Sequence, residues 1–139
     1  MGVFTDIGKP CENLIHHFKQ CHAAFLESNY DVTMLENGRY PYFLKKRISG
    51  DKGHLSNKQA LELFTMHRPS FMSHLLLSHL SKNNNCPKLV QHLFNEHAAG
   101  VKIIVTSRYE ETEVYHINDT TNVISLPHCT SPQLSFAFA

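Results

Sequence analysis

The sequence predicts an α/β fold. Short apolar segments with the character of strands alternate along the chain with segments whose apolar residues recur at helical spacing. The clearest strand, residues 72–81, is apolar at the consecutive positions Leu75, Leu76 and Leu77, a pattern typical of strands that are covered on both faces. The composition, with 42% hydrophobic and 18% charged residues in 139, is that of one globular domain.

The first elements place polar residues after apolar strands. Residues 2–8 form the first predicted strand, with Asp6 near its carboxyl end. Pro10 opens a helix, and the apolar residues of that helix share one face: Leu14, Ile15, Phe18 and Cys21. Residues 23–31 form a second strand, which ends in the polar cluster Glu27–Asp31.

The remaining elements are predicted from the glycine, proline and helix-capping residues that bound them. Residues 32–57 are expected to form short helical turns and loops, because glycine and proline interrupt them repeatedly. A helix follows at 58–68, capped by Ser56 or Asn57 and limited by Pro69. After the strand at 72–81, Pro87 opens another helix, which Gly100 ends. Residues 101–109 and 112–117 are predicted to be two strands, and 118–139 have no assignment.

The net charge, the apolar runs and the cysteines indicate where the protein is located and what it can bind. The net charge of +1 provides no overall basic field, so binding of a polyanion must depend on a local patch. The apolar runs are shorter than the roughly 20 residues that span a bilayer. Four cysteines without a Cys-x-x-Cys pair favour reduced thiols. We therefore expect a cytoplasmic chain with no membrane partner.

Eleven histidines are unusual for this length, and one of them, His79, follows an apolar strand. Asp6 and the cluster at 27–31 occupy similar positions at the ends of strands. A carboxylate and an imidazole brought together there suit zinc or manganese. The alternative is that these are hydrogen-bonded polar groups without a ligand.

Two further segments suggest phosphate binding. "GHLSNKQA" places His54 before a helix start, where free N–H groups attract anions, although a simple helix cap explains the same residues. Lys45, Lys46 and Arg47 lie beside aromatic residues in "YFLKKRISGDKG". Such a run can hold a nucleic-acid backbone, and it can equally be a solvated helix face.

Five motifs in register resemble the C-terminal half of metallo-β-lactamase-fold hydrolases, in the YycJ-type branch that is similar to ribonuclease Z. They are "FTDIG", "CENLIHHFKQCHAAFLESNYD", "YPYFLKKRISGDKGHLSN", "LLLSHLSKNNN" and "VKIIVTSRYEETEVY". The resemblance implies that residues 1–117 are half of an αββα sandwich, truncated or split. It also implies a metal-dependent phosphodiesterase or nuclease that uses two divalent ions, zinc or manganese.

The resemblance also implies roles for individual residues. Asp6 matches a carboxylate that bridges two metal ions, and His79 matches the last histidine ligand. His54 looks like the catalytic histidine on the substrate side. The substrate would further contact Lys45, Lys46, Arg47, Ser81 and Asn83. Glu27 and Asp31 would orient a histidine by accepting a hydrogen bond from its ring.

The His-x-His-x-Asp-His signature of that family is absent from the sequence. We therefore expect a chain that needs the missing N-terminal half, or association with a second copy, for activity. Two alternatives stay open. One is a noncatalytic fragment or binding module, and the other is a hydrolase of another ester or a lactam on the same fold.

Overall fold

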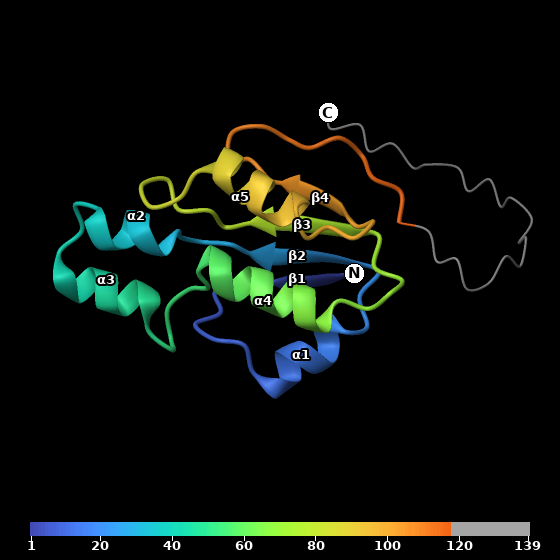
Figure 1. Ribbon diagram of the computed structural model, residues 1–139, viewed down its shortest axis with the longest axis horizontal. Coiled ribbons are helices and arrows are strands. Elements are labelled where there is room, and N and C mark those ends of the chain that lie inside the picture. The colour runs from blue at the N-terminus through green and yellow to red at the C-terminus, as the bar shows by residue number, and fades with distance from the viewer. Residues whose placement is uncertain (118–139) are drawn as a thin grey trace, which may run out of the picture.

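The computed structural model describes residues 1–117, and it confirms the α/β prediction. One sheet contains four parallel strands in the order β1-β2-β3-β4 (Figure 1). Their bounds are Gly2–Phe4 for β1, Ala23–Glu27 for β2, His74–Ser78 for β3 and Lys102–Val105 for β4. Because all four strands run in the same direction, their carboxyl ends meet at one edge of the sheet.

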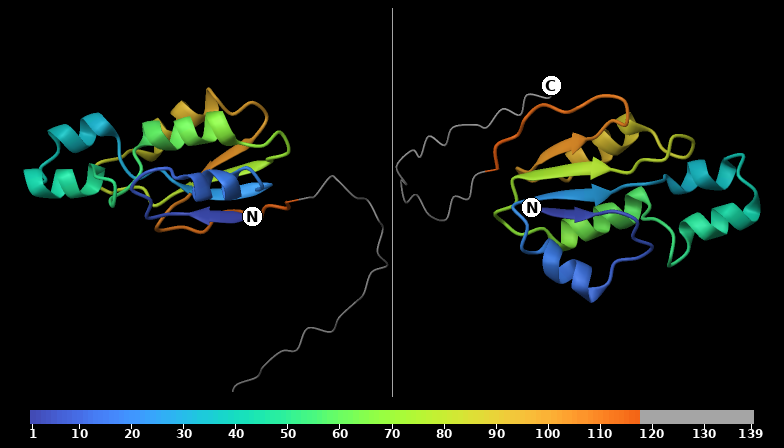
Figure 2. Two further views of the ribbon diagram at one scale, coloured as in Figure 1. Left: turned by 90° about the horizontal axis from the view of Figure 1, so that it is seen from below. Right: turned by 180° about the vertical axis from the view of Figure 1, so that it is seen from behind.

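Three helices cover one face of this sheet: α1 (Glu12–Phe18), α4 (Asn57–His67) and α5 (Pro87–Asn95), as Figure 2 shows. The core lies between them and the strands. Its fully buried side chains include Phe18, Leu26, Phe64, Leu75, Leu77, Val90 and Phe94. The apolar helix faces read from the sequence are therefore the faces that bury area against the sheet, which is the main source of stability in such a layer.

Local signals fix where these helices begin. Ser56 caps α4: Gln59 N donates to Ser56 Oγ (3.2 Å), and Ser56 N donates to Gln59 Oε1 (3.0 Å). Of the two caps that the sequence left open, Ser56 is the one found. Pro87 is the first residue of α5, where its missing N–H costs no helical hydrogen bond.

The segment between β2 and α4 forms two short helices, α2 (Val32–Asn37) and α3 (Tyr42–Ser49). Together they project from one end of the sheet (Figure 1). The predicted short helical turns are thus confirmed. Asp31 caps α2, because its Oδ1 accepts a hydrogen bond from Met34 N (2.9 Å).

One predicted strand is wrong. Residues 112–117 form no strand. Val114 is 85% exposed, and Tyr115 is held by side-chain contacts with Lys102 and His74 at the start of β4 and β3. Side-chain contacts of Tyr115 thus hold this segment beside the sheet without a backbone ladder.

Within residues 1–117, no helix has the length and apolar composition needed to cross a membrane. Cys11, Cys21 and Cys86 are free thiols, and burial raises the pKa of the Cys21 thiol. Cys129 and the unassigned tail at 118–139 lie outside the described residues.

Candidate metal centre

Three polar residues lie at or just after the carboxyl ends of three neighbouring strands. Glu27 is the last residue of β2, while Asp6 and His79 follow β1 and β3. Both Asp6 (φ 58°) and His79 (φ 59°) have left-handed backbones. For residues with a Cβ this conformation costs about 1–2 kcal/mol, and such strain concentrates at functional sites. The turns direct both side chains to the same edge of the sheet.

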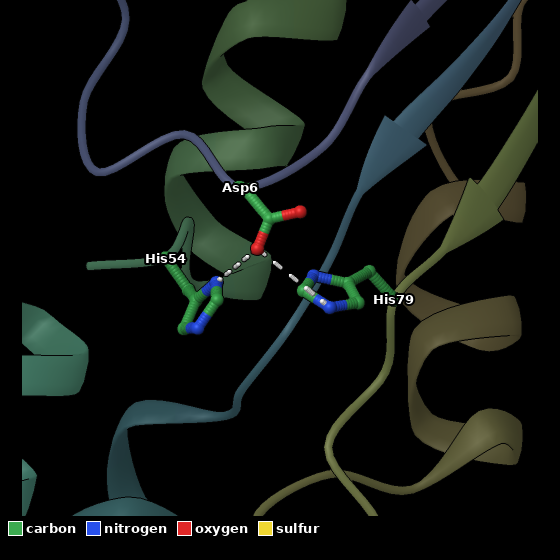
Figure 3. Close-up of side chains that lie close together, drawn as sticks. All are labelled: Asp6, His54 and His79. Carbon is green, nitrogen blue, oxygen red and sulfur yellow. Dashed lines mark ion pairs between the residues drawn. The ribbon is translucent and has the colours of Figure 1, made fainter. Parts of the chain in front are cut away.

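Asp6, His54 and His79 form a group that could hold a metal ion, since one ligand atom of each lies within 4.8 Å of the others. Asp6 Oδ1 is 3.9 Å from His54 Nδ1 and 3.9 Å from His79 Nε2 (Figure 3). The two rings meet edge to face, with centroids 5.0 Å apart. One carboxylate and two imidazoles are a donor set that suits a borderline divalent ion such as zinc.

A buried carboxylate organises both rings. Glu27 is fully buried, and its Oε1 lies 2.7 Å from His54 Nδ1 and 2.8 Å from His79 Nδ1. Its Oε2 accepts a hydrogen bond from Ile7 N (2.9 Å). An ionised carboxylate only accepts, so each ring must donate Nδ1–H to it. Both Nε2 atoms are then left with lone pairs.

The two histidines use those lone pairs differently. His79 Nε2 faces Asp6, so these two residues point ligand atoms at a common position. In His54 the Nδ1 atom, already bound to Glu27, is the one nearer Asp6, and the second ring nitrogen points away from Asp6 (Figure 3). The geometry thus favours Asp6 and His79 as ligands, and it leaves His54 Nε2 available for a proton.

His54 is positioned by a tight loop after α3. Its N–H donates to Ile48 O (2.8 Å), and Gly53 N donates to Gly50 O (2.8 Å). A Cβ built on Gly53 would lie 2.1 Å from Ile48 O, so only glycine allows this approach. The glycine of "GHLSN" therefore has a structural reason.

His79 is positioned by buried amides. Asn29 Nδ2 donates to His79 O (2.7 Å), and Ser81 N donates to Asn29 O (2.7 Å). Asn85 Nδ2 in turn donates to the backbone oxygens of Ser28 (2.8 Å) and Asn29 (3.0 Å). These contacts fix the loop that carries the strained His79 backbone.

Both histidines line a cleft of about 830 Å³ at this edge. Ser81 lines it as well, and Asn83 donates to Tyr40 OH (3.0 Å) beside it. The cations at the cleft are Lys82 and Arg108, neither of which was singled out from the sequence. The available signal was their position: Lys82 comes directly after the predicted strand at 72–81, and Arg108 lies near the carboxyl end of the one predicted at 101–109.

Other predicted site residues lie elsewhere. Lys45 and Lys46 line a separate hollow of about 450 Å³ between α2 and α3. Arg47 is exposed on α3. For Asp31 the structure shows the helix cap described above, and it is Glu27 that contacts the histidines.

The chain is similar in sequence to curated exodeoxyribonucleases. Exodeoxyribonuclease YycJ of Bacillus anthracis is 32% identical over 120 residues, which are 86% of this chain and 43% of that protein. Exodeoxyribonuclease WalJ of Streptococcus pneumoniae is 33% identical over 87 residues, which are 63% of this chain and 32% of that protein. The chain is distantly homologous to these enzymes. It spans less than half of their length. No family model and no solved structure matches it.

Proposed function

We propose that residues 1–117 are the C-terminal half of a metallo-β-lactamase-like domain, similar to ribonuclease Z, whose site hydrolyses phosphodiesters in DNA. The observation that supports this most directly is Glu27, which is buried and bonded to Nδ1 of both His54 and His79 beside Asp6. A carboxylate that is hydrogen-bonded to one ring nitrogen is the usual group that fixes the orientation of a metal-ligating or proton-transferring histidine. Homology to exodeoxyribonucleases supports DNA as the substrate.

In this proposal Asp6 Oδ1 and His79 Nε2 hold divalent metal, zinc or manganese, with two ions in the complete site. When bound, such ions would make a coordinated water more acidic and would neutralise charge on the phosphoryl oxygens. Zinc takes about four ligands. The remaining ligands would therefore come from water, substrate and a second polypeptide segment, either the N-terminal half of the fold or another copy of the chain.

The chain's own residues would handle the proton and the substrate. Glu27 holds the Nδ1 proton of His54, so the Nε2 lone pair of His54 can accept a proton and return it to the leaving oxygen. Ser81 lies in the cleft and Asn83 beside it, within reach of a phosphate. The basic run Lys45–Arg47 on α3 would hold the nucleic-acid backbone outside the cleft.

Metal stoichiometry after zinc or manganese loading tests the proposal. Zinc or manganese bound by the wild-type chain should be lost in Asp6→Ala and His79→Ala and retained in His54→Ala, because the free His54 nitrogen faces away from Asp6. Equal metal in all four proteins would contradict the assignment of ligands.

Activity is the second readout. With the N-terminal half supplied, the chain should hydrolyse a DNA phosphodiester, and His54→Ala should lower kcat by about 10²–10⁴-fold while metal stays bound. Turnover of a thioester or a lactam in place of the diester would contradict the proposed substrate class. DNA binding without any hydrolysis would identify a binding module instead.

A further inference from the structure

The two histidines of the candidate metal centre lie in loops that are both attached to one segment, residues 28–31, which follows β2. On one side, Asn29 N donates to Leu55 O (2.9 Å), and Leu55 is the residue after the first histidine. Asn57 N, at the start of α4, donates to Tyr30 O (2.8 Å). The loop before α4 is therefore hydrogen-bonded to the backbone that follows β2.

On the other side, the same segment is bonded to the chain around the second histidine. Ser28 N donates to Ser78 O (3.0 Å), and Ser78 is the residue before His79. Asp31 N donates to Asn84 O (2.8 Å), further along the loop that follows β3. The backbone after β2 thus lies between the two histidine loops and contacts both of them.

A buried side-chain network joins the same three parts of the chain. Asn57 and Asn85 form a reciprocal amide pair, in which the Nδ2 atom of each donates to the Oδ1 atom of the other at 2.9 Å. Ser28 Oγ donates to Asn57 Oδ1 (2.7 Å), and Asn85 Nδ2 also donates to Ser28 O (2.8 Å). None of the three residues is more than 6% exposed. Because solvent does not reach these groups, a displacement of one part would leave a buried polar group without a partner.

Each member of the network is close in sequence to one group of the candidate centre. Ser28 follows Glu27 directly, Asn57 comes three residues after His54, and Asn85 comes six residues after His79. The distances that depend on this arrangement are those from Glu27 Oε1 to the two Nδ1 atoms, 2.7 and 2.8 Å. Such bonds weaken beyond about 3.2 Å, so a shift of about half an ångström in either loop is enough to disturb one ring.

We propose that Ser28, Asn57 and Asn85 are positioning residues that set the separation of the His54 and His79 rings, so that one carboxylate holds both. The inference rests on the proposed function and deepens it, because this separation relates the proposed metal ligand to the proposed proton carrier. Asn85 lines the cleft, but both polar atoms of its side chain are engaged within the protein, where Oδ1 also accepts from the next backbone N–H (2.9 Å). The three residues therefore act through the histidines.

Nuclear magnetic resonance of the metal-free chain in EDTA tests the positioning directly. Two-bond proton–nitrogen correlation spectra distinguish a ring protonated at Nδ1 from one protonated at Nε2, and at about pH 8 an ordinary imidazole is neutral. In the wild type both rings should be Nδ1–H tautomers, with their signals assigned from His54→Ala and His79→Ala. In Asn57→Ala and in Asn85→Ala at least one ring should also populate the Nε2–H tautomer, because the bond that selects Nδ1–H is weakened.

Gln91→Ala is the matched control. The Gln91 amide also joins two elements, since its Nε2 donates to Ile103 O in β4 (3.2 Å), and it does not line the cleft. This variant should leave both tautomers unchanged. Circular dichroism identifies the folded variants, and Ser28→Ala, which removes one hydrogen bond of the network, gives the same test if an asparagine variant fails to fold.

Zinc affinity measures the consequence for the proposed ligand. Asn57→Ala and Asn85→Ala should each raise the zinc Kd at least about tenfold, the loss typical when the group that orients a ligating histidine is disturbed. The double variant should raise the Kd no further than the larger single effect, because both residues act through one contact. A Kd that rises by the product of the two single effects would contradict the pair.

The positioning role is overturned if the wild-type rings are not both Nδ1–H tautomers, or if the folded network variants keep both tautomers unchanged. An equal response of Gln91→Ala would also overturn it, since any loss of packing would then have the same effect. The two proposals fail separately. Tautomers that depend on the network, in a chain that neither binds zinc nor cleaves DNA, would contradict the proposed function alone. Zinc binding and hydrolysis with tautomers that ignore the network would contradict the positioning role alone.

Discussion

Replacing Glu27 with glutamine tests whether one buried carboxylate sets the state of both imidazoles. Glutamine keeps the shape but presents one oxygen and one NH₂ group. If the NH₂ group occupies the Oε2 position, it faces Ile7 N–H, and a buried donor loses its acceptor. If it occupies the Oε1 position, His54 and His79 must move their protons from Nδ1 to Nε2. That shift removes the His79 lone pair that faces Asp6.

The two orientations of the amide affect different quantities: one lowers folding stability, and the other weakens metal binding. An orphaned buried donor costs about 1–3 kcal/mol of folding stability. Loss of the group behind a metal-ligating histidine typically weakens metal binding by about 10–100-fold, or about 1.4–2.8 kcal/mol. We therefore expect Glu27→Gln either to lower the free energy of unfolding by about 1–3 kcal/mol or to raise the zinc Kd at least about tenfold, depending on the orientation that the amide adopts.

Urea unfolding followed by circular dichroism in EDTA measures the first quantity, and competition with a chromophoric chelator measures the zinc Kd. Glu62→Gln is the control, because Glu62 is exposed on α4. It should change neither value. A Glu27→Gln chain that unfolds within about 0.5 kcal/mol of the wild type and binds zinc equally well would refute this account of Glu27.

Three further substitutions test the supporting structure. Gly53→Ala places a Cβ 2.1 Å from Ile48 O, so it should displace the His54 loop and lower the thermal midpoint of unfolding, measured by calorimetry. Ser56→Ala removes the α4 cap and should cost about 1 kcal/mol in urea unfolding. Burial and Lys102 lower the pKa of His74 below its ordinary value of 6.5, so the unfolded chain takes up this proton first and stability falls as the pH drops through that value. His74→Gln should make the loss of stability between about pH 7.5 and about pH 5 shallower than in the wild type; an unchanged slope would contradict it.

The sequence predicted where the strands lie better than it predicted which strands pair. Three consecutive leucines at 75–77 indicated a strand inside the sheet, and β3 does pair with β2 and β4. Leu75 and Leu77 pack under the helices, which cover one face of the sheet. The strand order was not readable from these residues. That order places β2 between β1 and β3, and it is the reason Glu27 lies between Asp6 and His79, which follow β1 and β3.

The candidate site was readable only in part. Asp6 and His79 were singled out because each follows an apolar strand. His54 was noted before a helix start as part of a possible anion site, and its catalytic role came from a resemblance. Their roles stay predictions. The cations of the cleft were missed for a physical reason: Lys45–Arg47 is the densest basic run in the sequence, but sequence does not show which way the α2–α3 segment projects. Arg108 is a single residue whose significance depends on its contact with Leu80.

The carboxyl edge of the sheet combines features that cost stability. Asp6 and His79 have left-handed backbones, at about 1–2 kcal/mol each. Glu27 is a fully buried carboxylate that pairs with the two histidines. An apolar side chain of similar volume at a buried ionic position is often neutral or stabilising. Nothing in the packing of residues 1–117 requires all three departures at one place. A site that must hold two imidazoles and a carboxylate at fixed distances beside an anion-favouring cleft does require them, which is why function explains this edge better than stability does.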